Sequence, residues 1–262
     1  MVPRALTVLE IACRLTQYGR LPERLLAVLG RDRRVSVRRL ASRYQRIRAA
    51  ARAEALRLRA LYTEERRRAR RWQVIAGVDE VGRGPLAGPV FAAAVILGPG
   101  RAIPGLNDSK RLPREERERL DREIRASALG VAVGEASVKE INRLNILRAT
   151  RLAMLRAVAA LVPRPGFLLI DGRERLPERG PQAAVIKGDA SCACIAAASI
   201  IAKVARDQRM MELDQMFPSY GFAQHKGYAT TDHRAALARY GPCPEHRRAF
   251  LRPDQLALFS LP

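Results

Sequence analysis

Four carboxylates in this chain of 262 residues stand beside glycines at the ends of apolar runs. Asp79 and Glu80 follow the run VIAGV, Asp171 follows FLLI, and Asp189 comes shortly after AAVI. Carboxylates that converge on one point repel one another unless a cation neutralises them. Their oxygens prefer hard cations, so we expect these four residues to be catalytic ligands of Mg²⁺ or Mn²⁺. Two such ions ~3.5–4 Å apart can stabilise the attacking and the leaving oxygen of a phosphodiester during its cleavage.

Each acid also has a structural explanation that the sequence leaves open. Aspartates such as Asp171 are common in turns, and Asp189 could cap the helix predicted to begin near Ser191. Adjacent residues of a strand face opposite sides. Asp79 and Glu80 therefore reach a single metal cluster only if the backbone bends there, which the glycines at 82 and 84 would allow.

Other catalytic or binding motifs are weak. The glycine-rich stretch lacks the Gly-Lys-Ser/Thr ending of a P-loop, and a strand rather than a helix is predicted after it, which argues against a dinucleotide site. The sequence contains no Gly-x-Ser-x-Gly elbow. No zinc-ligand spacing relates the cysteines and histidines, which are Cys13, Cys192, Cys194, Cys243, His225, His233 and His246. We therefore expect reduced thiols rather than a zinc site.

The elements that must position the acids alternate between strands and helices from Gln73 onward. We expect strands over Val74–Val81, Val90–Leu97, Leu129–Val138, Phe167–Ile170 and Ala183–Ile186. We expect helices over Pro113–Ala126, over Val138–Leu161 and from Ser191 to about Met216. This alternation predicts an α/β layered domain, and the close spacing of the first three strands favours an antiparallel portion.

The segment before this domain, residues 1–72, is basic and has a helical pattern. It holds 20 arginines and 6 acidic residues, and the whole chain has a net charge of +22. Apolar residues recur every three or four positions from Val37 to Tyr62, as on one face of a long helix, and Arg66 to Arg71 is interpreted as a basic linker. Such charge indicates a polyanionic partner, most simply nucleic acid, with an anionic membrane surface as the alternative. We expect a substrate-binding helical extension over 1–72 and a catalytic domain over 73–262.

Composition excludes several other classes of protein. The chain has no run of about 18 apolar residues, so we predict no membrane span. The first 30 residues lack the continuous apolar core of a secretory signal. We therefore expect a cytoplasmic protein, and we expect it to act as a monomer.

Seven stretches of the chain together resemble bacterial ribonuclease HII, the type 2 ribonuclease H. They are DEVGRGPLAGPV at 79–90, DSKRL at 108–112, NIL at 145–147, IDG at 170–172, KGDA at 187–190, AAASIIAKVARD at 196–207 and YGFAQHKGYAT at 220–230. The resemblance implies a ribonuclease H-like fold with a five-stranded mixed sheet flanked by helices. It also implies an endonuclease that hydrolyses the RNA strand of RNA–DNA hybrids and incises duplex DNA 5′ of single embedded ribonucleotides, leaving 5′-phosphate and 3′-hydroxyl ends.

The same resemblance implies roles for individual residues. The metal-binding acids of the family fall on Asp79, Glu80, Asp171 and Asp189. The Gly-Arg-Gly that recognises the ribose 2′-hydroxyl falls on Gly82, Arg83 and Gly84, and the junction-sensing tyrosine falls on Tyr228. We expect phosphate contacts from Lys110 and Lys226. The implied cofactor is Mn²⁺ or Mg²⁺, and the implied partners are RNA–DNA hybrids and ribonucleotide-containing duplex DNA.

The extension departs from the family pattern, because many members begin only a few residues before the aspartate-glutamate strand. It is similar in placement to the helical extension of some Gram-positive members but is richer in arginine. One alternative function is a non-catalytic protein that binds RNA–DNA hybrids, which a missing acid would favour. Another is a resolvase or a type 3 ribonuclease H, against which the Gly-Arg-Gly and Lys-Gly-Tyr motifs argue.

Overall fold

The structure is a computed structural model that describes residues 7–8, 10, 23–98, 102–177 and 180–251. Cys13 lies outside the described residues. The chain divides into two compact units, Met1–Arg57 and Leu58–Pro262. The division falls inside a helix and precedes the change in composition after residue 72.

The first unit contains α2 (Glu23–Gly30) and most of α3 (Val35–Leu61), which is the long basic helix expected from the sequence. Leu26 and Leu29 on α2 pack against Val37 and Ala41 on α3, with a few partly buried neighbours. The apolar stripe of α3 is not buried along its whole length, because Ile47 is 55% exposed. The middle of this helix therefore has no apolar partner among the described residues.

The second unit is built on a five-stranded sheet with the order β3-β2-β1-β4-β5. The strands are β1 (Ile75–Val81), β2 (Val90–Leu97), β3 (Ala128–Ala136), β4 (Phe167–Asp171) and β5 (Gln182–Val185). β1 pairs antiparallel with β2, and β2 pairs antiparallel with β3. β1 pairs parallel with β4, and β4 pairs parallel with β5. The mixed five-stranded sheet expected from the sequence is confirmed.

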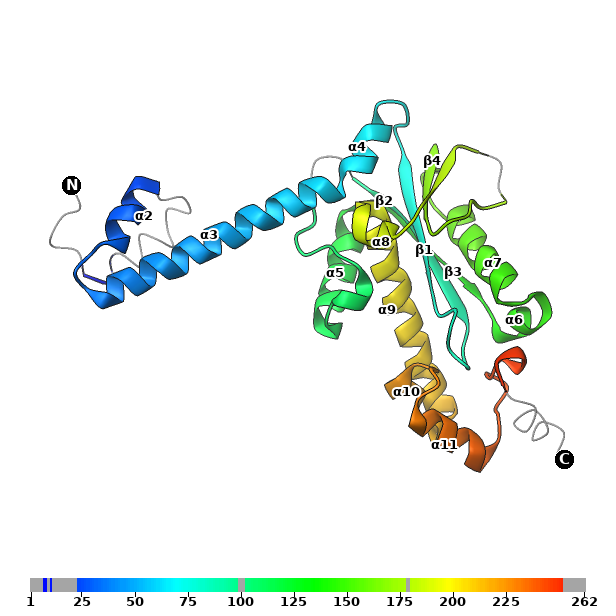
Figure 1. Cartoon of the computed structure of the whole chain (residues 1–262). Helices are drawn as coiled ribbons and strands as arrows, with labels where there is room; N and C mark the ends of the chain where they lie inside the picture. The colour runs from blue at the N-terminus through cyan, green and yellow to red at the C-terminus, as the bar shows by residue number, and fades with distance from the viewer. Residues whose placement is uncertain (1–6, 9, 11–22, 99–101, 178–179, 252–262) are drawn as a thin grey trace. The chain divides into compact units, whose positions relative to one another are not determined.

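Helices cover both faces of this sheet (Figure 1). The α-helices of the second unit are α4 (Thr63–Ala69), α5 (Arg114–Ser127), α6 (Val138–Leu144), α7 (Ile146–Ala159), α8 (Gly188–Ser191), α9 (Ala193–Met216), α10 (Phe222–His225) and α11 (Thr231–Tyr240). The described residues of this unit also form the short 3-10 helices η1 (Ser109–Arg111), η2 (Pro218–Tyr220) and η3 (Arg248–Phe250). One apolar cluster joins α7 to the sheet, and a second joins α5 and α9 to the opposite face.

Glycines and alanines let the helices approach the sheet closely. A Cβ atom added to Gly77 on β1 would lie 2.2 Å from the carbonyl carbon of Cys194 in the first turn of α9. A Cβ atom on Gly134 in β3 would lie 2.1 Å from the carbonyl oxygen of Ala153 in α7. The helix backbone thus occupies core space that large side chains would otherwise fill. This explains how a chain with only 5% aromatic residues fills its core.

The single helix predicted over Val138–Leu161 is wrong, because the chain breaks at Asn145 into α6 and α7. Asn145 has a φ of 71°, a conformation that asparagine tolerates better than most residues. Its side chain accepts a hydrogen bond from the backbone N–H of Arg148 at 3.1 Å and so caps α7. One residue therefore ends the first helix and starts the second.

The basic linker predicted over Arg66 to Arg71 is also wrong over most of its length, because Arg66–Ala69 belong to α4. The residues just before α4 pack on the core of the second unit. Leu58 and Leu61 are buried in the cluster beneath α9, and the hydroxyl of Tyr62 accepts a hydrogen bond from the backbone N–H of Ile103 at 3.3 Å. The end of the basic segment is thus part of the second unit, which we call the catalytic unit below because it carries the acids predicted to be catalytic.

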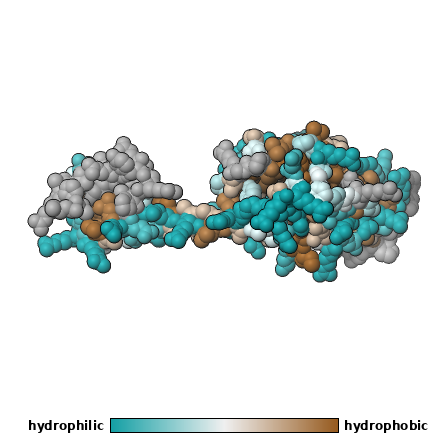
Figure 2. Space-filling model, turned by 90° about the horizontal axis from the view of Figure 1, so that it is seen from above, coloured by the Kyte–Doolittle hydropathy of each residue, from teal (hydrophilic) through white to brown (hydrophobic). Residues whose placement is uncertain are grey.

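The surface of the second unit is largely polar on the face that Figure 2 shows, with smaller hydrophobic areas. Within the described ranges, no helix combines the length and apolar character needed to span a bilayer.

Candidate active site

Three of the four predicted metal-binding acids lie near the carboxyl ends of the inner strands β1 and β4, and the fourth lies on the short helix α8. β1 and β4 are parallel neighbours with Val78 opposite Ile170, so the next residues, Asp79 and Asp171, continue side by side. Asp189 lies within α8, which precedes α9. Asp79 is only 6% exposed. The capping alternative for Asp189 is not supported, since Cys192 occupies the N-cap position of α9.

Asp79 and Glu80 point to opposite faces of the sheet. Val78 and Ile170 pack in the cluster beneath α7, so Asp79 and Asp171 face the side of α9. Glu80 lines a hollow of about 320 Å³ on the side of α7. β1 keeps its antiparallel pairing with β2 through Val81, so the backbone does not bend between the two acids. Glu80 therefore approaches the other acids around the end of the sheet.

Burial and mutual repulsion make the carboxylates costly to ionise. Burial raises the pKa of Asp79 well above its ordinary value, and the charges of Glu80 and Asp171 add to that effect. Burial also raises the pKa of Glu80, opposed by Arg83, whose Nη1 lies 3.2 Å from Glu80 Oε1. Burial and the charge of Asp189 raise the pKa of Asp171. A cation between these groups would favour their ionised forms and remove the repulsion.

The donor set fits a hard divalent cation, because it consists only of carboxylate oxygens. In the portion of the chain that the structure describes, no three acidic, histidine or cysteine side chains already stand in ligand positions around one point. The backbone N–H of Gly188 donates to Asp171 Oδ1 at 2.7 Å and so links α8 to the end of β4. The fold thus brings the end of β4 and the short helix α8, which carries Asp189, into direct contact.

Lys110 lies beside the acids, with its Nζ 3.7 Å from Asp189 Oδ2. Burial alone would lower the pKa of Lys110, but the carboxylates of Asp189 and Asp79 raise it overall. The loop that carries Lys110 is fixed at two points. The side chain of Asp108 accepts a hydrogen bond from the N–H of Lys110 at 2.9 Å, and the N–H of Ser109 donates to Ser199 Oγ on α9 at 3.2 Å.

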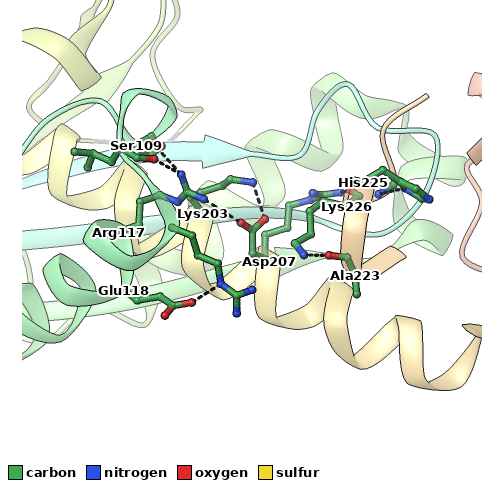
Figure 3. A network of polar contacts seen from close by, with 12 residues as sticks. Ser109, Arg117, Glu118, Lys203, Asp207, Ala223, His225 and Lys226 are labelled. Carbon is green, nitrogen blue, oxygen red and sulfur yellow. Dashed lines mark hydrogen bonds and ion pairs between the residues drawn. The ribbon is translucent and has the colours of Figure 1, made fainter. Parts of the chain in front are cut away.

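A second polar network supports this loop from α5 and α9 (Figure 3). Lys203 Nζ donates to Asp207 Oδ1 at 2.6 Å, and Arg117 lies 3.8 Å from the other carboxylate oxygen of Asp207. Arg117 also donates to the carbonyl of Ser109 at 3.3 Å. Lys226 turns back onto α10, where its ammonium donates to the carbonyl of Ala223. Asp207 thus neutralises the basic side chains that hold the loop.

The Gly-Arg-Gly turn and Tyr228 lie next to each other in the structure. Gly82 has a φ of +90°, and an added Cβ atom would lie 2.2 Å from Arg206 Nε, so no other residue fits there. A Cβ atom on Gly84 would lie 3.9 Å from the ring of Tyr228. Tyr228 is 43% exposed. The turn and the tyrosine thus form one accessible surface beside the acids.

Two buried arginines behind this surface were missed from the sequence. Arg247 donates to the carbonyls of Gly82 at 2.6 Å and Arg83 at 3.0 Å. Arg206 donates to the carbonyl of Lys226 at 3.0 Å and to that of Pro89 at 3.2 Å. The position of Arg206 on the buried stripe of α9 was a signal that could have been found, whereas Arg247 lies in a loop and has no such pattern.

A pair of buried histidines holds the backbone of Tyr228. The N–H of Cys243 donates to His246 Nδ1 at 3.0 Å, so the ring proton of a neutral His246 lies on Nε2. That proton is donated to His233 Nε2 at 3.0 Å. His233 then donates from Nδ1 to the carbonyl of Tyr228 at 2.8 Å. Only one pair of neutral tautomers satisfies this chain of hydrogen bonds.

A mixed sheet of this order, flanked by helices and carrying acids at the ends of two central strands, defines a ribonuclease H-like fold. The crystal structure of the ribonuclease H2 from Pyrococcus horikoshii OT3 is similar, with a TM-score of 0.59 and 25% identity over 71% of this chain and 99% of that one. The family model for ribonuclease HII matches residues 76–254.

Curated relatives extend this similarity beyond the catalytic unit. The ribonuclease HII of Desulfitobacterium hafniense (strain DSM 10664 / DCB-2) is 50% identical over 234 residues, which is 89% of this chain and 90% of that protein. Ribonuclease HII 1 of Methylibium petroleiphilum is 57% identical over 180 residues, which is 68% of this chain and 90% of that protein. The chain therefore belongs to the ribonuclease HII family. It is a nuclease that cleaves the RNA strand of RNA–DNA hybrids.

The buried histidine pair predicts a loss of stability in mild acid. Burial lowers the pKa of His233 to about 4 and that of His246 to about 3, from an ordinary value of 6.5. Between pH 6.5 and 4 the unfolded chain therefore binds more protons, and the free energy of unfolding falls as the pH falls. By this linkage we expect a loss on the order of 2 kcal/mol per histidine at pH 4.5.

Urea unfolding at pH 7.5 and pH 4.5 measures this loss. Other groups also titrate in this range, so the control is the double variant His233→Gln with His246→Gln. Its stability should depend less steeply on pH than that of the wild type. The same pH dependence in both proteins would contradict the prediction.

Proposed function

We propose that this protein incises duplex DNA on the 5′ side of a single embedded ribonucleotide, in addition to cleaving the RNA strand of hybrids. The observation that supports the proposal is that the turn at Gly82–Gly84, which contacts Tyr228, directly follows the strand of Asp79 and Glu80, and that Arg83 in this turn pairs with Glu80 at 3.2 Å. The turn with Tyr228 would then recognise the ribose 2′-hydroxyl of the same nucleotide whose phosphodiester is hydrolysed at the acids. A non-catalytic hybrid-binding protein is disfavoured, because all four acids are present.

In this proposal Asp79, Glu80, Asp171 and Asp189 hold one or two Mg²⁺ or Mn²⁺ ions. Such ions supply a nucleophile at neutral pH from bound water and stabilise charge on the attacking and leaving oxygens. The protein's own contribution is to gather the oxygens in a buried position and to exclude bulk water around Asp79. The products would carry 5′-phosphate and 3′-hydroxyl ends.

Lys110 and Arg83 would orient the phosphates next to the scissile bond. The side chain of Lys110 is 78% exposed, and that of Arg83 is 52% exposed. Each is held near an acid of the cluster, so each cation can contact a phosphate without moving far. Lys226 is a weaker candidate, because its ammonium already binds the carbonyl of Ala223.

The turn at Gly82–Gly84 would recognise the 2′-hydroxyl through its backbone. That hydroxyl both donates and accepts a hydrogen bond, which is the feature that distinguishes RNA from DNA at a single position. Arg247 holds the carbonyls of Gly82 and Arg83, which fixes the turn before the substrate arrives. The hydroxyl of Tyr228 would add a contact at the junction of RNA and DNA.

The extension over residues 1–72 would add phosphate contacts outside the catalytic centre. Arginines such as Arg39, Arg43, Arg46 and Arg52 are exposed along α3. Only one acid, Glu54, accompanies the arginines of this helix. The partners would be RNA–DNA hybrids and ribonucleotide-containing duplex DNA, and we include in the proposal a monomeric, cytoplasmic protein.

Asp79→Asn tests the metal site, since it removes a charge and a ligand but little volume. We expect turnover of an RNA–DNA hybrid to fall by ~10²-fold or more, given what metal ions contribute to such reactions. Binding of the hybrid, measured by fluorescence anisotropy, should persist. The matched control is Asp232→Asn, which changes an exposed aspartate on α11. Near-normal turnover by the Asp79 variant would overturn the assignment of the four acids.

A duplex DNA with one ribonucleotide tests the choice of substrate. We expect a single nick on the 5′ side of the ribonucleotide, and none when a 2′-deoxy or 2′-fluoro unit replaces it. An unpaired buried polar group costs roughly 1–3 kcal/mol, or ~5–150-fold in rate, before any misplacement of the metal ions. Efficient cleavage of all-DNA duplex, or a nick on the 3′ side, would contradict the proposal.

Tyr228→Phe should moderately reduce the cleavage rate of the duplex with one ribonucleotide. Its effect on the cleavage rate of a continuous RNA–DNA hybrid should be smaller. Tyr240→Phe is the matched control, because Tyr240 is also exposed, at 50%.

Replacing four arginines of α3 by glutamine tests the extension. We expect the full-length variant Arg39→Gln, Arg43→Gln, Arg46→Gln, Arg52→Gln to bind hybrids more weakly. Each lost phosphate contact should flatten the log–log dependence of the binding constant on salt by ~0.9 for duplex DNA. The corresponding lysine variant retains the charge and should restore the slope. An unchanged affinity and slope in the glutamine variant would show that these arginines only face solvent.

A further inference from the structure

A backbone N–H in the first turn of α9 donates a hydrogen bond to a side chain of the basic segment that precedes the strands. Glu65 on α4 accepts a hydrogen bond from the backbone N–H of Cys194 at 2.7 Å. The N-cap residue of this 24-residue helix, Cys192, makes no side-chain capping bond of its own. The first N–H groups of a helix need acceptors, and a negative charge near them is favourable.

Glu65 is held in this place by its surroundings. Its second oxygen, Oε2, is buried and has no hydrogen-bond partner among the described residues. Burial raises the pKa of Glu65, while the N–H of Cys194 opposes that shift. A buried carboxylate oxygen without a partner is costly, so simple surface solvation does not account for the position of this side chain. The contact with α9 does account for it.

From this contact we infer that Glu65 is a positioning residue for the catalytic acids. It caps α9 from α4 and thereby fixes the first turn of that helix, against which the elements carrying Asp79, Asp171 and Asp189 are packed. The inference rests on the proposed role of these acids.

Three short contacts connect the capped turn to the acids. The backbone of Cys194 packs directly on Gly77, two residues before Asp79 in β1. The N–H of Cys192 donates to the carbonyl of Gly188 at 2.7 Å, which joins α9 to the helix that carries Asp189. The N–H of Gly188 in turn donates to Asp171 Oδ1 at 2.7 Å. A shift of the first turn would therefore move three of the four acids together.

The inference gives the end of the basic segment a second role, distinct from substrate binding. Leu58 and Leu61 anchor the segment in the core beneath α9, and Tyr62 binds the backbone of Ile103. Glu65 follows directly on α4. The arginines of α3 would then affect affinity for the substrate, whereas Glu65 would affect the rate of the chemical step.

The test compares three variants of the full-length protein. Glu65→Ala removes the acceptor, Glu65→Gln keeps a carbonyl acceptor, and Glu64→Ala is the matched control, because Glu64 pairs with Arg68 on the same helix at 3.2 Å. We measure kcat and KM on an RNA–DNA hybrid at saturating Mn²⁺, the concentration of Mn²⁺ that gives half-maximal rate, and hydrogen exchange of the first turn of α9.

For Glu65→Ala we expect kcat to fall about 10-fold, since small displacements of catalytic groups have effects of this size or larger. KM for the hybrid should stay within about twofold, because the phosphate contacts remain. The concentration of Mn²⁺ for half-maximal rate should rise, and the amides of the first turn should exchange faster. Glu65→Gln should recover most of the rate, and Glu64→Ala should match the wild type.

A wild-type kcat and unchanged exchange in Glu65→Ala would overturn the inference, as would an equal loss in Glu64→Ala. If Glu65→Ala does not fold, Glu65→Met is the replacement, because it fills the same space without accepting a hydrogen bond. We expect the same fall in kcat for Glu65→Met. A wild-type kcat for Glu65→Met would also overturn the inference. Failure of the proposed function is distinguishable, because the wild type itself would then not require the four acids, while hydrogen exchange would still report on the cap.

Discussion

The direct contact between the first turn of α9 and β1 at Gly77 is the constraint on which the catalytic unit depends. Any side chain at Gly77 would overlap the backbone of Cys194. The absence of a side chain brings the helix onto the sheet, and the acids of β1, β4 and α8 meet around that contact. Close backbone packing therefore brings the carboxylates near one another, and burial raises the pKa values of Asp79, Glu80 and Asp171.

Two buried arginines, Arg206 and Arg247, fix the backbone around the Gly82–Gly84 turn. Arg206 and Arg247 are both fully buried, and their guanidinium groups bind backbone carbonyls rather than carboxylates. Burial lowers the pKa of Arg247 to about 9, and the neighbouring charge of Arg206 contributes. Such an arrangement is tolerated because carbonyl dipoles converge on the charge. It gives a rigid turn at Gly82–Gly84, to which the histidine pair adds a fixed Tyr228.

The basic segment before the catalytic strands combines two physical roles. Along α3 its arginines are exposed, and the middle of the apolar stripe has no partner within the described residues. At its end, Leu58, Leu61 and Glu65 are built into the catalytic core. The change from one role to the other occurs within a few residues and is not marked by any change in the density of arginine.

The sequence by itself determined the fold class and the five strands, and it identified four acids close to strand ends, of which Asp189 lies on α8 rather than on a strand. Strands such as Val90–Leu97 are long apolar runs between turn-forming residues, so local pattern is enough to find them. The roles of Gly84 and Tyr228 in substrate recognition stay predictions. The assignment of metal binding to the acids stays a prediction, and so does the substrate-binding role of the extension.

Only the tertiary structure decided the remaining features. Asn145 breaks a helix because it adopts a positive φ, which periodicity alone does not reveal. Arg247 and Glu65 bind backbone groups far away in the chain, and no local spacing encodes such contacts. The opposite orientation of Asp79 and Glu80 follows from pairing with β2 through Val81, where glycine had suggested a bend. For Arg247, Glu65 and the pair Asp79–Glu80, the deciding backbone contact joins segments that local sequence patterns do not relate to one another.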